Sequence, residues 1–194
     1  MSRETSGAPV LPTTPTADPN WLVVEEGFNL AREHEIESLF AVANGYVGTR
    51  GSLAEGCSLS APATFVAGVF DIPSGAHPAP ELVVAPDWLR LRAAVDGQEL
   101  RLENGELLEH RRILDLRQGI LWREWRQRDP TGRITSIRGL RLASLADRLM
   151  TIGQRELEVN ARERHGELRK TTDLSLAALD ALRQSVSSRA ARAS

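Results

Sequence analysis

The stretch DWLRLRAAVDGQELRL, Asp87 to Leu102, decides which fold class the sequence predicts. Apolar and basic side chains alternate along its first half, namely Leu89, Arg90, Leu91, Arg92 and Val95. Asp96 and Gly97 then stand where a tight hairpin needs a positive φ angle. Alternation with a period of two that runs into such a pair is typical of an antiparallel β-hairpin.

Further strand and turn signals lie on both sides of this hairpin. Asn104-Gly105 is a second pair of the same kind, and Asp-Pro-Thr-Gly at 129–132 divides the segment 120–144 into two candidate strands. The runs at 21–28 and 64–71 are short and apolar, as strands often are. Closely spaced strands with turns between them favour an antiparallel sandwich or barrel. No β-α-β alternation is present, which disfavours a doubly wound nucleotide-binding fold.

One helix is expected between the runs at 21–28 and 64–71. Asn29 can cap a helix through residues 30–44, in which Leu30, Ile36, Leu39 and Phe40 share roughly one face. Part of the segment also alternates, at 35–39, so an extended conformation is the alternative there.

Composition and charge exclude several classes of protein. The 194 residues suit one good-sized domain or two small ones, and the net charge of −2 argues against a general nucleic-acid binder. No window is apolar enough for a membrane span, and the N-terminus lacks the apolar region of a secretory signal. A single cysteine fits a reducing cytoplasm, and the four histidines follow no zinc spacing, so neither a metal nor a cofactor is expected.

The segment NGYVGTRG, residues 44–51, is the first candidate functional site. A phosphate-binding loop would need a strand before it and a helix after it, and there is no Walker lysine, so nucleotide binding is disfavoured. Its glycines allow backbone geometry or close approach that a Cβ would forbid. Arg50 could bind a carboxylate or phosphate in a bidentate manner, but such an arginine more often ties a loop to its own domain.

The second candidate site is the charged segment 109–125, in which Arg112, Asp115, Arg123 and Glu124 stand among apolar residues. A structural charge ladder across neighbouring strands is the favoured interpretation. No pair of acids is singled out for acid/base catalysis, and no Ser/His/Asp pattern occurs. The tryptophans could form a sugar platform, although core positions are more common for them: Trp21, Trp88, Trp122 and Trp125.

Five segments occur in an order that resembles a known family. They are GFNLAREHEIESLFAVANGYVGTRGSLAEG (27–56), TFVAGVFD (64–71), ELVVAPDWLRL (81–91), RRILDLRQGILWRE (111–124) and RLASLADR (141–148). The series is similar to the N-terminal domain of glycoside hydrolase family 65, which includes maltose, trehalose and kojibiose phosphorylases and related hydrolases. The resemblance runs from about Trp21 to about Arg148 and continues more weakly to Asp173. Thr49 departs from it, because the family usually has an apolar residue there.

The resemblance implies a mainly β fold, an antiparallel super-sandwich of the galactose-mutarotase type, incomplete on this chain. Residues 1–19 are rich in Pro, Thr, Ser and Ala and show no periodicity, so a disordered leader is expected there. The resemblance assigns 20–173 to a partial family 65 β-sandwich domain and leaves 174–194 as a divergent tail, whose pattern is typical of a short C-terminal helix. In the family an (α/α)6 barrel carries the catalytic acid and the phosphate site, and phosphate or water attacks an α-glucoside with inversion. No catalytic residue can therefore be assigned on this chain.

The same resemblance implies that the partner is a catalytic barrel, absent here, or a homologous partner chain. An α-glucoside disaccharide is the implied ligand of the assembled protein. The loop expected to meet the barrel or approach the sugar comprises Asn44, Gly45, Tyr46, Gly48, Arg50 and Gly51. The alternatives are a standalone carbohydrate- or partner-binding module and a non-functional remnant, left by a truncation, a frameshift or a degenerate paralogue.

Overall fold

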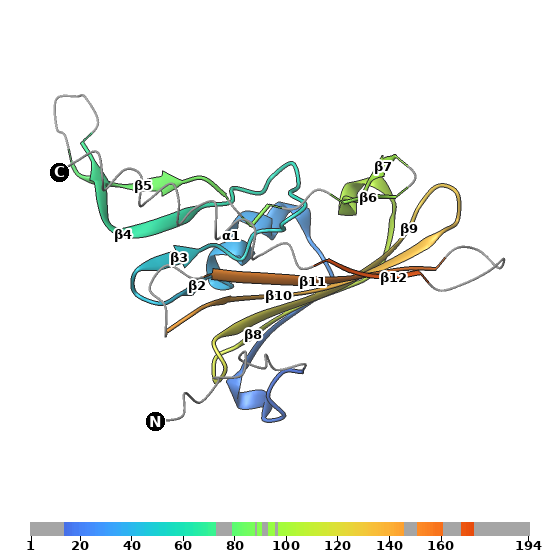
Figure 1. Ribbon diagram of the computed structural model, residues 1–194, viewed down its shortest axis with the longest axis horizontal. Helices are drawn as coiled ribbons and strands as arrows, with labels where there is room; N and C mark the ends of the chain where they lie inside the picture. The colour runs from blue at the N-terminus through green and yellow to red at the C-terminus, as the bar shows by residue number, and fades with distance from the viewer. Residues whose placement is uncertain are drawn as a thin grey trace, which may run out of the picture.

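The computed structural model describes residues 14–72, 79–87, 89–90, 93–95, 97–145, 151–160 and 168–172. The chain is mainly β, with antiparallel sheets and one short α-helix, which is consistent with a β-sandwich (Figure 1). The predicted fold class is therefore confirmed. The predicted C-terminal helix falls in 174–194, outside the described residues.

A long six-stranded sheet forms one layer. In spatial order its strands are β1 (Leu22–Glu26), β8 (Glu106–Asp115), β9 (Ile120–Arg128), β10 (Ile134–Ala143), β11 (Thr151–Asn160) and β12 (Leu168–Thr172), with every neighbouring pair antiparallel. Gly132, at φ 83°, closes the predicted turn between β9 and β10, where an L side chain would be strained.

Apart from η1 (Pro19–Trp21), the remaining elements lie on one side of this sheet (Figure 1). They include a four-stranded sheet of β2 (Val42–Ala43), β3 (Val47–Thr49), β4 (Thr64–Asp71) and β5 (Glu81–Ala85), and a hairpin of β6 (Ala94–Val95) and β7 (Gln98–Glu99). The helix α1 (Glu33–Leu39) is accompanied by three 3-10 turns: η1 (Pro19–Trp21), η2 (Leu30–Arg32) and η3 (Leu102–Asn104).

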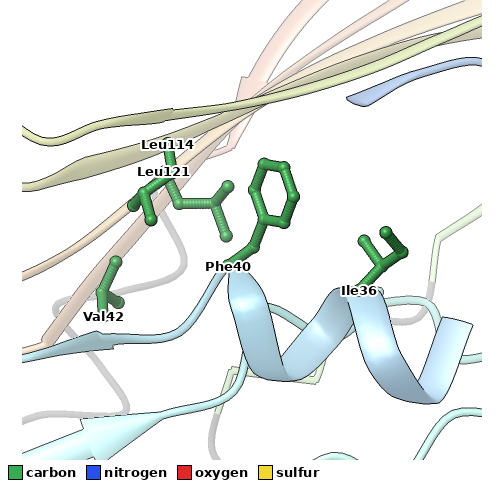
Figure 2. Packing of buried hydrophobic residues seen from close by; sticks show 5 residues of the cluster. All are labelled: Ile36, Phe40, Val42, Leu114 and Leu121. Carbon is green, nitrogen blue, oxygen red and sulfur yellow. The ribbon is translucent and has the colours of Figure 1, made fainter. Parts of the chain in front are cut away.

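A small apolar cluster holds α1 on the long sheet. Ile36 and Phe40 face Leu114 of β8 and Leu121 of β9, and Val42 completes the cluster (Figure 2). Phe40 is only 2% exposed. Full burial of a side chain of this kind contributes about 1.5–3 kcal/mol, so this cluster fixes the position of the helix.

A second cluster joins the β6–β7 hairpin to the same sheet. It contains Leu53, Leu100, Leu102 and Trp125, all buried. Trp125 lies in β9, two strand positions beyond Arg123, on the face that is turned toward α1. The strand alternation therefore places both clusters on one face of the sheet.

The predicted helix over 30–44 is wrong in length. Asn29 caps the 3-10 turn η2 by accepting a hydrogen bond from the amide of Ala31, whereas α1 begins only at Glu33, after Arg32, and ends at Leu39. Val42 instead pairs with Thr49 between β2 and β3. The helical pattern continues in the sequence beyond Leu39. The backbone N–H and C=O groups of β2, however, are paired with β3 instead of with a further helical turn. Residues 35–39 are helical, which excludes the extended alternative.

The two predicted hairpin turns have different outcomes. Gly97, at φ 78°, does join β6 to β7, although each strand is two residues long and Leu91, Arg92 and Asp96 lie outside the described residues. The expected turn at Asn104-Gly105 is wrong, because Gly105 is extended at φ −159° after a 3-10 turn. A Cβ on Gly105 would lie 2.6 Å from the carbonyl oxygen of Arg128, so close packing explains this glycine.

Candidate functional site

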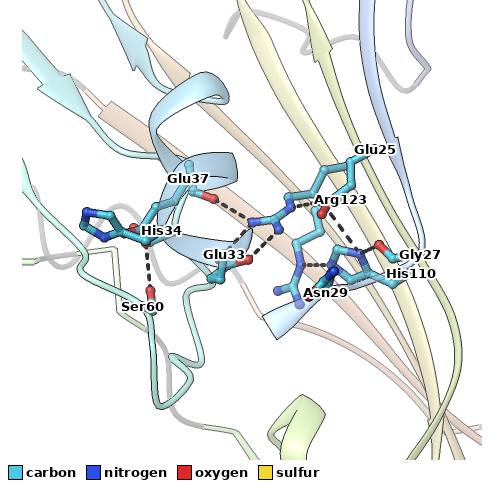
Figure 3. A network of polar contacts seen from close by, with 12 residues as sticks. Glu25, Gly27, Asn29, Glu33, His34, Glu37, Ser60, His110 and Arg123 are labelled. Atoms are coloured by element: carbon cyan, nitrogen blue, oxygen red, sulfur yellow. Dashed lines mark hydrogen bonds and ion pairs between the residues drawn. The ribbon is translucent and has the colours of Figure 1, made fainter. Parts of the chain in front are cut away.

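A layer of charged side chains is buried between α1 and the long sheet. At its centre is Arg112 of β8, whose side chain is completely buried. Its Nη1 donates to Oε1 of Glu33 at 3.0 Å and its Nη2 donates to Oε2 of Glu33 at 2.5 Å, while its Nε donates to Glu25. Figure 3 shows these acids converging from α1 and β1. Both oxygens of Glu33 are thus held by one guanidinium in bidentate geometry.

The environment shifts the pKa values of this pair. Burial raises the pKa of Glu33 above its usual range, against the opposing effect of Arg112. Burial would lower the pKa of Arg112, but the hydrogen bonds that it donates to Glu33 and Glu25 outweigh this effect, and the pKa is raised. A raised glutamate pKa is a common sign of an acid catalyst. Here Glu33 is fully buried and bidentately paired, so the arrangement is structural.

Arg123 of β9 forms the second buried pair. Its Nη1 and Nη2 donate to the two carboxylate oxygens of Glu55 at 2.7 and 2.6 Å. Its Nε donates to Nε2 of His110 at 3.2 Å, and its guanidinium lies 5.5 Å from the ring centroid of Trp125. A cation above an aromatic face is a favourable contact, so Trp125 stacks on a side chain of its own domain.

His110 is held as a neutral imidazole. Its Nδ1 lies 2.8 Å from the carbonyl oxygen of Gly27 and donates to it, because Nε2 accepts from Arg123. Burial, reinforced by the positive charge of Arg123, lowers the pKa of His110 from 6.5 to about 3.

Folding stability is therefore expected to fall on mild acidification. The folded imidazole stays neutral down to about pH 3, whereas the unfolded one takes up a proton below its ordinary pKa of 6.5. Unfolding thus binds one proton in this window, and the free energy of unfolding should decrease by about 1.4 kcal/mol per pH unit as the pH falls below 6.5. Urea titrations at several pH values between 6.5 and 5 measure this slope.

The matched variants are His110→Gln, which should flatten the slope, and His34→Gln, which removes an imidazole that is 68% exposed and should keep it. A wild-type slope that survives in His110→Gln would contradict the assignment. NMR titration of the His110 ring provides a second readout that does not depend on the stability of the variant.

Glu37 of α1 organises the segment beyond the helix. This buried carboxylate accepts from Ser60 Oγ at 2.9 Å and from the amide of Ala61 at 2.9 Å. Arg50 Nη2 lies 3.2 Å from Glu37 Oε1 and also donates to the carbonyl oxygen of His34 at 2.7 Å. The predicted site residue Arg50 thus ties its loop to its own helix.

Arg141 of β10 fixes the same segment from the sheet side. Its Nη1 donates to the carbonyl oxygen of Arg50, and its Nη2 donates to that of Ser52 at 3.0 Å. Burial lowers the pKa of Arg141 to about 10. Gly51 lies between these two anchors, and its amide donates to the carbonyl oxygen of Glu37 at 2.6 Å.

The six residues of the predicted loop are divided between two places. Asn44, Gly45 and Tyr46 form the tight turn between β2 and β3, in which Asn44 Oδ1 accepts from the amides of Tyr46 and Val47. The other three follow: Gly48 lies within β3, and Arg50 and Gly51 come after it, against α1. The three spaced glycines therefore do not line one cradle.

The four residues of the predicted charge cluster are also separated. Arg112 and Arg123 are cross-strand neighbours on the inner face, each paired with an acid from outside the two strands. Glu124 is on the outer face, where Arg138 Nε lies 3.2 Å from it. Asp115 ends β8, so the possibility that an extended strand carries it and Arg117 on one face is excluded.

Asp115 orders the turn that follows β8. Burial would raise its pKa, but amide donors outweigh this and hold the pKa below its usual range. Its carboxylate accepts from the amides of Arg117 and Gln118 at 3.0 and 2.9 Å, and from that of Thr16 at 2.7 Å. This carboxylate thus joins the start of the described chain to the β8–β9 turn.

Sequence reasoning missed the acidic half of the buried layer. Glu33, Glu37 and Glu55 are buried, and each bonds a residue distant in sequence. Glu33 and Glu37 are four positions apart on α1, which places them on one helix face, but no local signal shows that this face is covered.

Among the described residues no group of three or more His, Cys, Asp or Glu side chains could hold a metal ion. Within the same ranges no helix has the length and apolar character needed to cross a membrane. Trp88 is outside the described residues, and Trp125 is 1% exposed, too buried to stack on a sugar.

Comparison with known proteins gives a consistent result. Residues 23–182 match the family model "Glycosyl hydrolase family 65, N-terminal domain". Kojibiose phosphorylase of Caldanaerobacter subterraneus subsp. tengcongensis is 40% identical over 131 residues, which is 68% of this chain and 17% of that protein. Alpha,alpha-trehalose phosphorylase of Thermoanaerobacter brockii is 29% identical over 139 residues, which is 65% of this chain and 18% of that protein.

A solved structure supports the fold. The chain described as a putative kojibiose phosphorylase from human microbiome superposes with a TM-score of 0.66 at 22% identity, covering 75% of this chain and 20% of the other. The present chain therefore spans about a fifth of the length of the relatives that it matches.

Proposed function

Since the chain belongs to glycosyl hydrolase family 65 and matches its N-terminal domain, we propose that it serves as the non-catalytic β-sandwich module of an α-glucoside disaccharide phosphorylase or hydrolase in the cytoplasm. Residues 20–173 form this module. The leader (1–19), whose Thr16 amide contacts Asp115, and the tail (174–194) flank it. Its partner is a catalytic barrel, or a homologous chain that carries one, and the assembled protein acts on a disaccharide such as kojibiose or trehalose.

One observation carries the non-catalytic role. In the part of the chain that the structure describes, each buried carboxylate is engaged by donors of the same domain: Glu33 by Arg112, Glu37 by Arg50, Glu55 by Arg123 and Asp115 by backbone amides. Glycoside cleavage needs an acid that faces the substrate and can give up its proton. These acids instead hold α1 and the segment 50–55 on the sheet.

The same network supports a role for the loop at 44–51 as the surface that meets the catalytic domain. Arg50 and Gly51 are fixed to α1, and Asn44 Nδ2 donates to the carbonyl oxygen of Ser144 at 2.6 Å, so the turn at the tip is anchored at both ends. Tyr46 at this tip is 43% exposed. A rigid, partly apolar tip suits a contact between domains.

Phosphorolysis assays test the proposal in two steps. The purified chain alone should release no glucose 1-phosphate from kojibiose or trehalose. A chimera in which this chain replaces the matched segment of the Caldanaerobacter kojibiose phosphorylase should phosphorolyse kojibiose. Turnover by the chain alone, or a chimera that folds and assembles yet shows no activity, would contradict the proposal.

The loop assignment has its own variant pair in the chimera. Tyr46→Ala should lower activity or thermal stability by more than Trp21→Ala, since Trp21 is an aromatic of similar exposure, 44%, on the distant turn η1. Equal effects of the two substitutions would contradict the assignment of the loop at 44–51 to the interface with the catalytic domain. A sugar-binding module is the alternative function, and calorimetric titration of the chain with kojibiose distinguishes it.

A further inference from the structure

Arg141 is a buried cation without an acidic partner in the part of the chain that the structure describes. It is 9% exposed, and its guanidinium donates to the carbonyl oxygens of Arg50 and Ser52. Arg112 and Arg123, on the same face of the sheet, are each paired with a glutamate instead. Because an unpaired charge is costly inside a protein, a compensating negative charge would stabilise Arg141.

Two buried hydroxyl groups in the segment that Arg141 holds also have no hydrogen-bond partner among the described residues. They are Thr49 Oγ1 and Ser52 Oγ, and the two residues are 3% and 5% exposed. Buried polar side-chain atoms in folded proteins are nearly always hydrogen-bonded to protein, water or a bound group. These two hydroxyls therefore indicate a partner other than the described residues.

The strand registers bring the hydroxyls to the same place as the cation. Thr49 of β3 lies opposite Val42 of β2, so their side chains share a face, and Val42 packs with Leu121 of the long sheet. Leu121 is the cross-strand neighbour of Arg141, so Thr49 faces the part of the sheet that carries Arg141. Ser52 is also adjacent, since its carbonyl oxygen accepts from Arg141 Nη2 at 3.0 Å.

We propose that the Arg141 site, formed by the guanidinium of Arg141 and the hydroxyls of Thr49 and Ser52, binds a small monovalent anion such as chloride. A guanidinium has five N–H groups, and the two carbonyl oxygens engage one on Nη1 and one on Nη2. The N–H of Nε and one further N–H on each Nη remain as donors. Two hydroxyls that can also donate complete a set of donors around one positive charge.

Charge favours a monovalent anion over the other possible occupants. Water could satisfy the hydroxyls, but it would leave the positive charge of Arg141 uncompensated, and the nearby cations Arg112 and Arg123 add to that charge. A phosphate or sulfate dianion would bring a second negative charge toward Asp87 and Glu55, whose carboxylates also act on Arg141. Like charges repel strongly where burial reduces screening, so one negative charge suits the site best.

Thermal unfolding of the full chain tests the site with chloride as the probe. Melting temperatures are measured in about 0.5 M sodium chloride and in the same concentration of sodium gluconate, whose bulky anion serves as the comparison. The difference between chloride and gluconate should be about 3 °C larger in the wild type than in Thr49→Val. This substitution removes one hydroxyl, keeps the shape of the side chain and introduces the apolar character that the family usually has there.

Thr135→Val is the matched control for this measurement. Thr135 is 2% exposed and lies on the same face of β10 as Arg141, six residues away or about 20 Å along the strand. Its substitution also removes a buried threonine hydroxyl, but the variant should keep the wild-type difference between the two salts. Effects of the salts on the rest of the surface are common to all three proteins and cancel in the comparison.

Crystals of the full chain grown with sodium bromide locate the anion directly. Bromide should give an anomalous peak in contact with the guanidinium of Arg141 and the hydroxyls of Thr49 and Ser52. Equal salt dependence in Thr49→Val and the wild type would overturn the proposal, as would anomalous peaks at exposed arginines alone, which would mean an adventitious ion only. Neither readout involves turnover, so the outcome is independent of the phosphorolysis assays and of the proposed function.

Discussion

Arg112→Met should destabilise the domain by about 3–5 kcal/mol, the cost of removing one partner from a buried ion pair. Glu33 is fully buried, and Arg112 donates to both of its oxygens, so the substitution leaves a buried carboxylate without the cation that is hydrogen-bonded to it. Glu25 loses its contact at the same time. For a domain of this size the melting temperature should fall by about 10 °C or more, measured by circular dichroism.

The neighbouring arginine on the same strand is the matched control. Arg111 pairs with Glu26 at 2.7 Å, but these side chains are 46% and 67% exposed. Exposed pairs contribute about 0–1 kcal/mol, so Arg111→Met should change the melting temperature only slightly. Adding Glu33→Gln to Arg112→Met should recover part of the lost stability, because it removes the buried carboxylate that Arg112 no longer neutralises. Equal effects of the two arginine substitutions would refute a buried role for Arg112.

Gly51→Ala should cost about 3 kcal/mol, at the upper end of the range for overpacking. A Cβ at this position would lie 2.6 Å from both the Cβ and the carbonyl oxygen of Phe40, closer than real Cβ atoms approach. The contact is with the backbone at the end of α1, so no flexible side chain can move aside. Relief would require a shift of α1, which carries Glu33 and Glu37.

Gly48→Ala separates this steric effect from a general sensitivity of the segment. Its added Cβ would meet the Ala43 side chain at 3.3 Å, a distance that a small movement can accommodate. Urea denaturation of both variants should show a loss for Gly51→Ala at least twice that for Gly48→Ala. A Gly51→Ala variant as stable as the wild type would mean that α1 does not pack against this residue as described.

The strands that follow local rules could be predicted. β1, β4, β9 and β10 have apolar runs bounded by turn residues, and Asp129 to Gly132 closes its turn with Gly132 at φ 83°. Strand alternation and turn formation depend on a few neighbouring residues, so they can be predicted from the local sequence. The end of α1 could not be predicted, because the helical pattern continues into residues that the second sheet takes for β2.

Arg111 and Arg112 show which features of a strand can be predicted from the local sequence and which cannot. As consecutive residues of a strand they must point to opposite faces, and the sequence by itself determines this much. Which face is covered was decided by α1 and the segment 50–55, through contacts such as Arg112 to Glu33, 79 residues away, and Arg123 to Glu55, 68 residues away. The sequence by itself determines the charge of each arginine. Which acid it pairs with, and how much the pair contributes to stability, depend on how deeply the packing of α1 and the segment 50–55 against the sheet buries it.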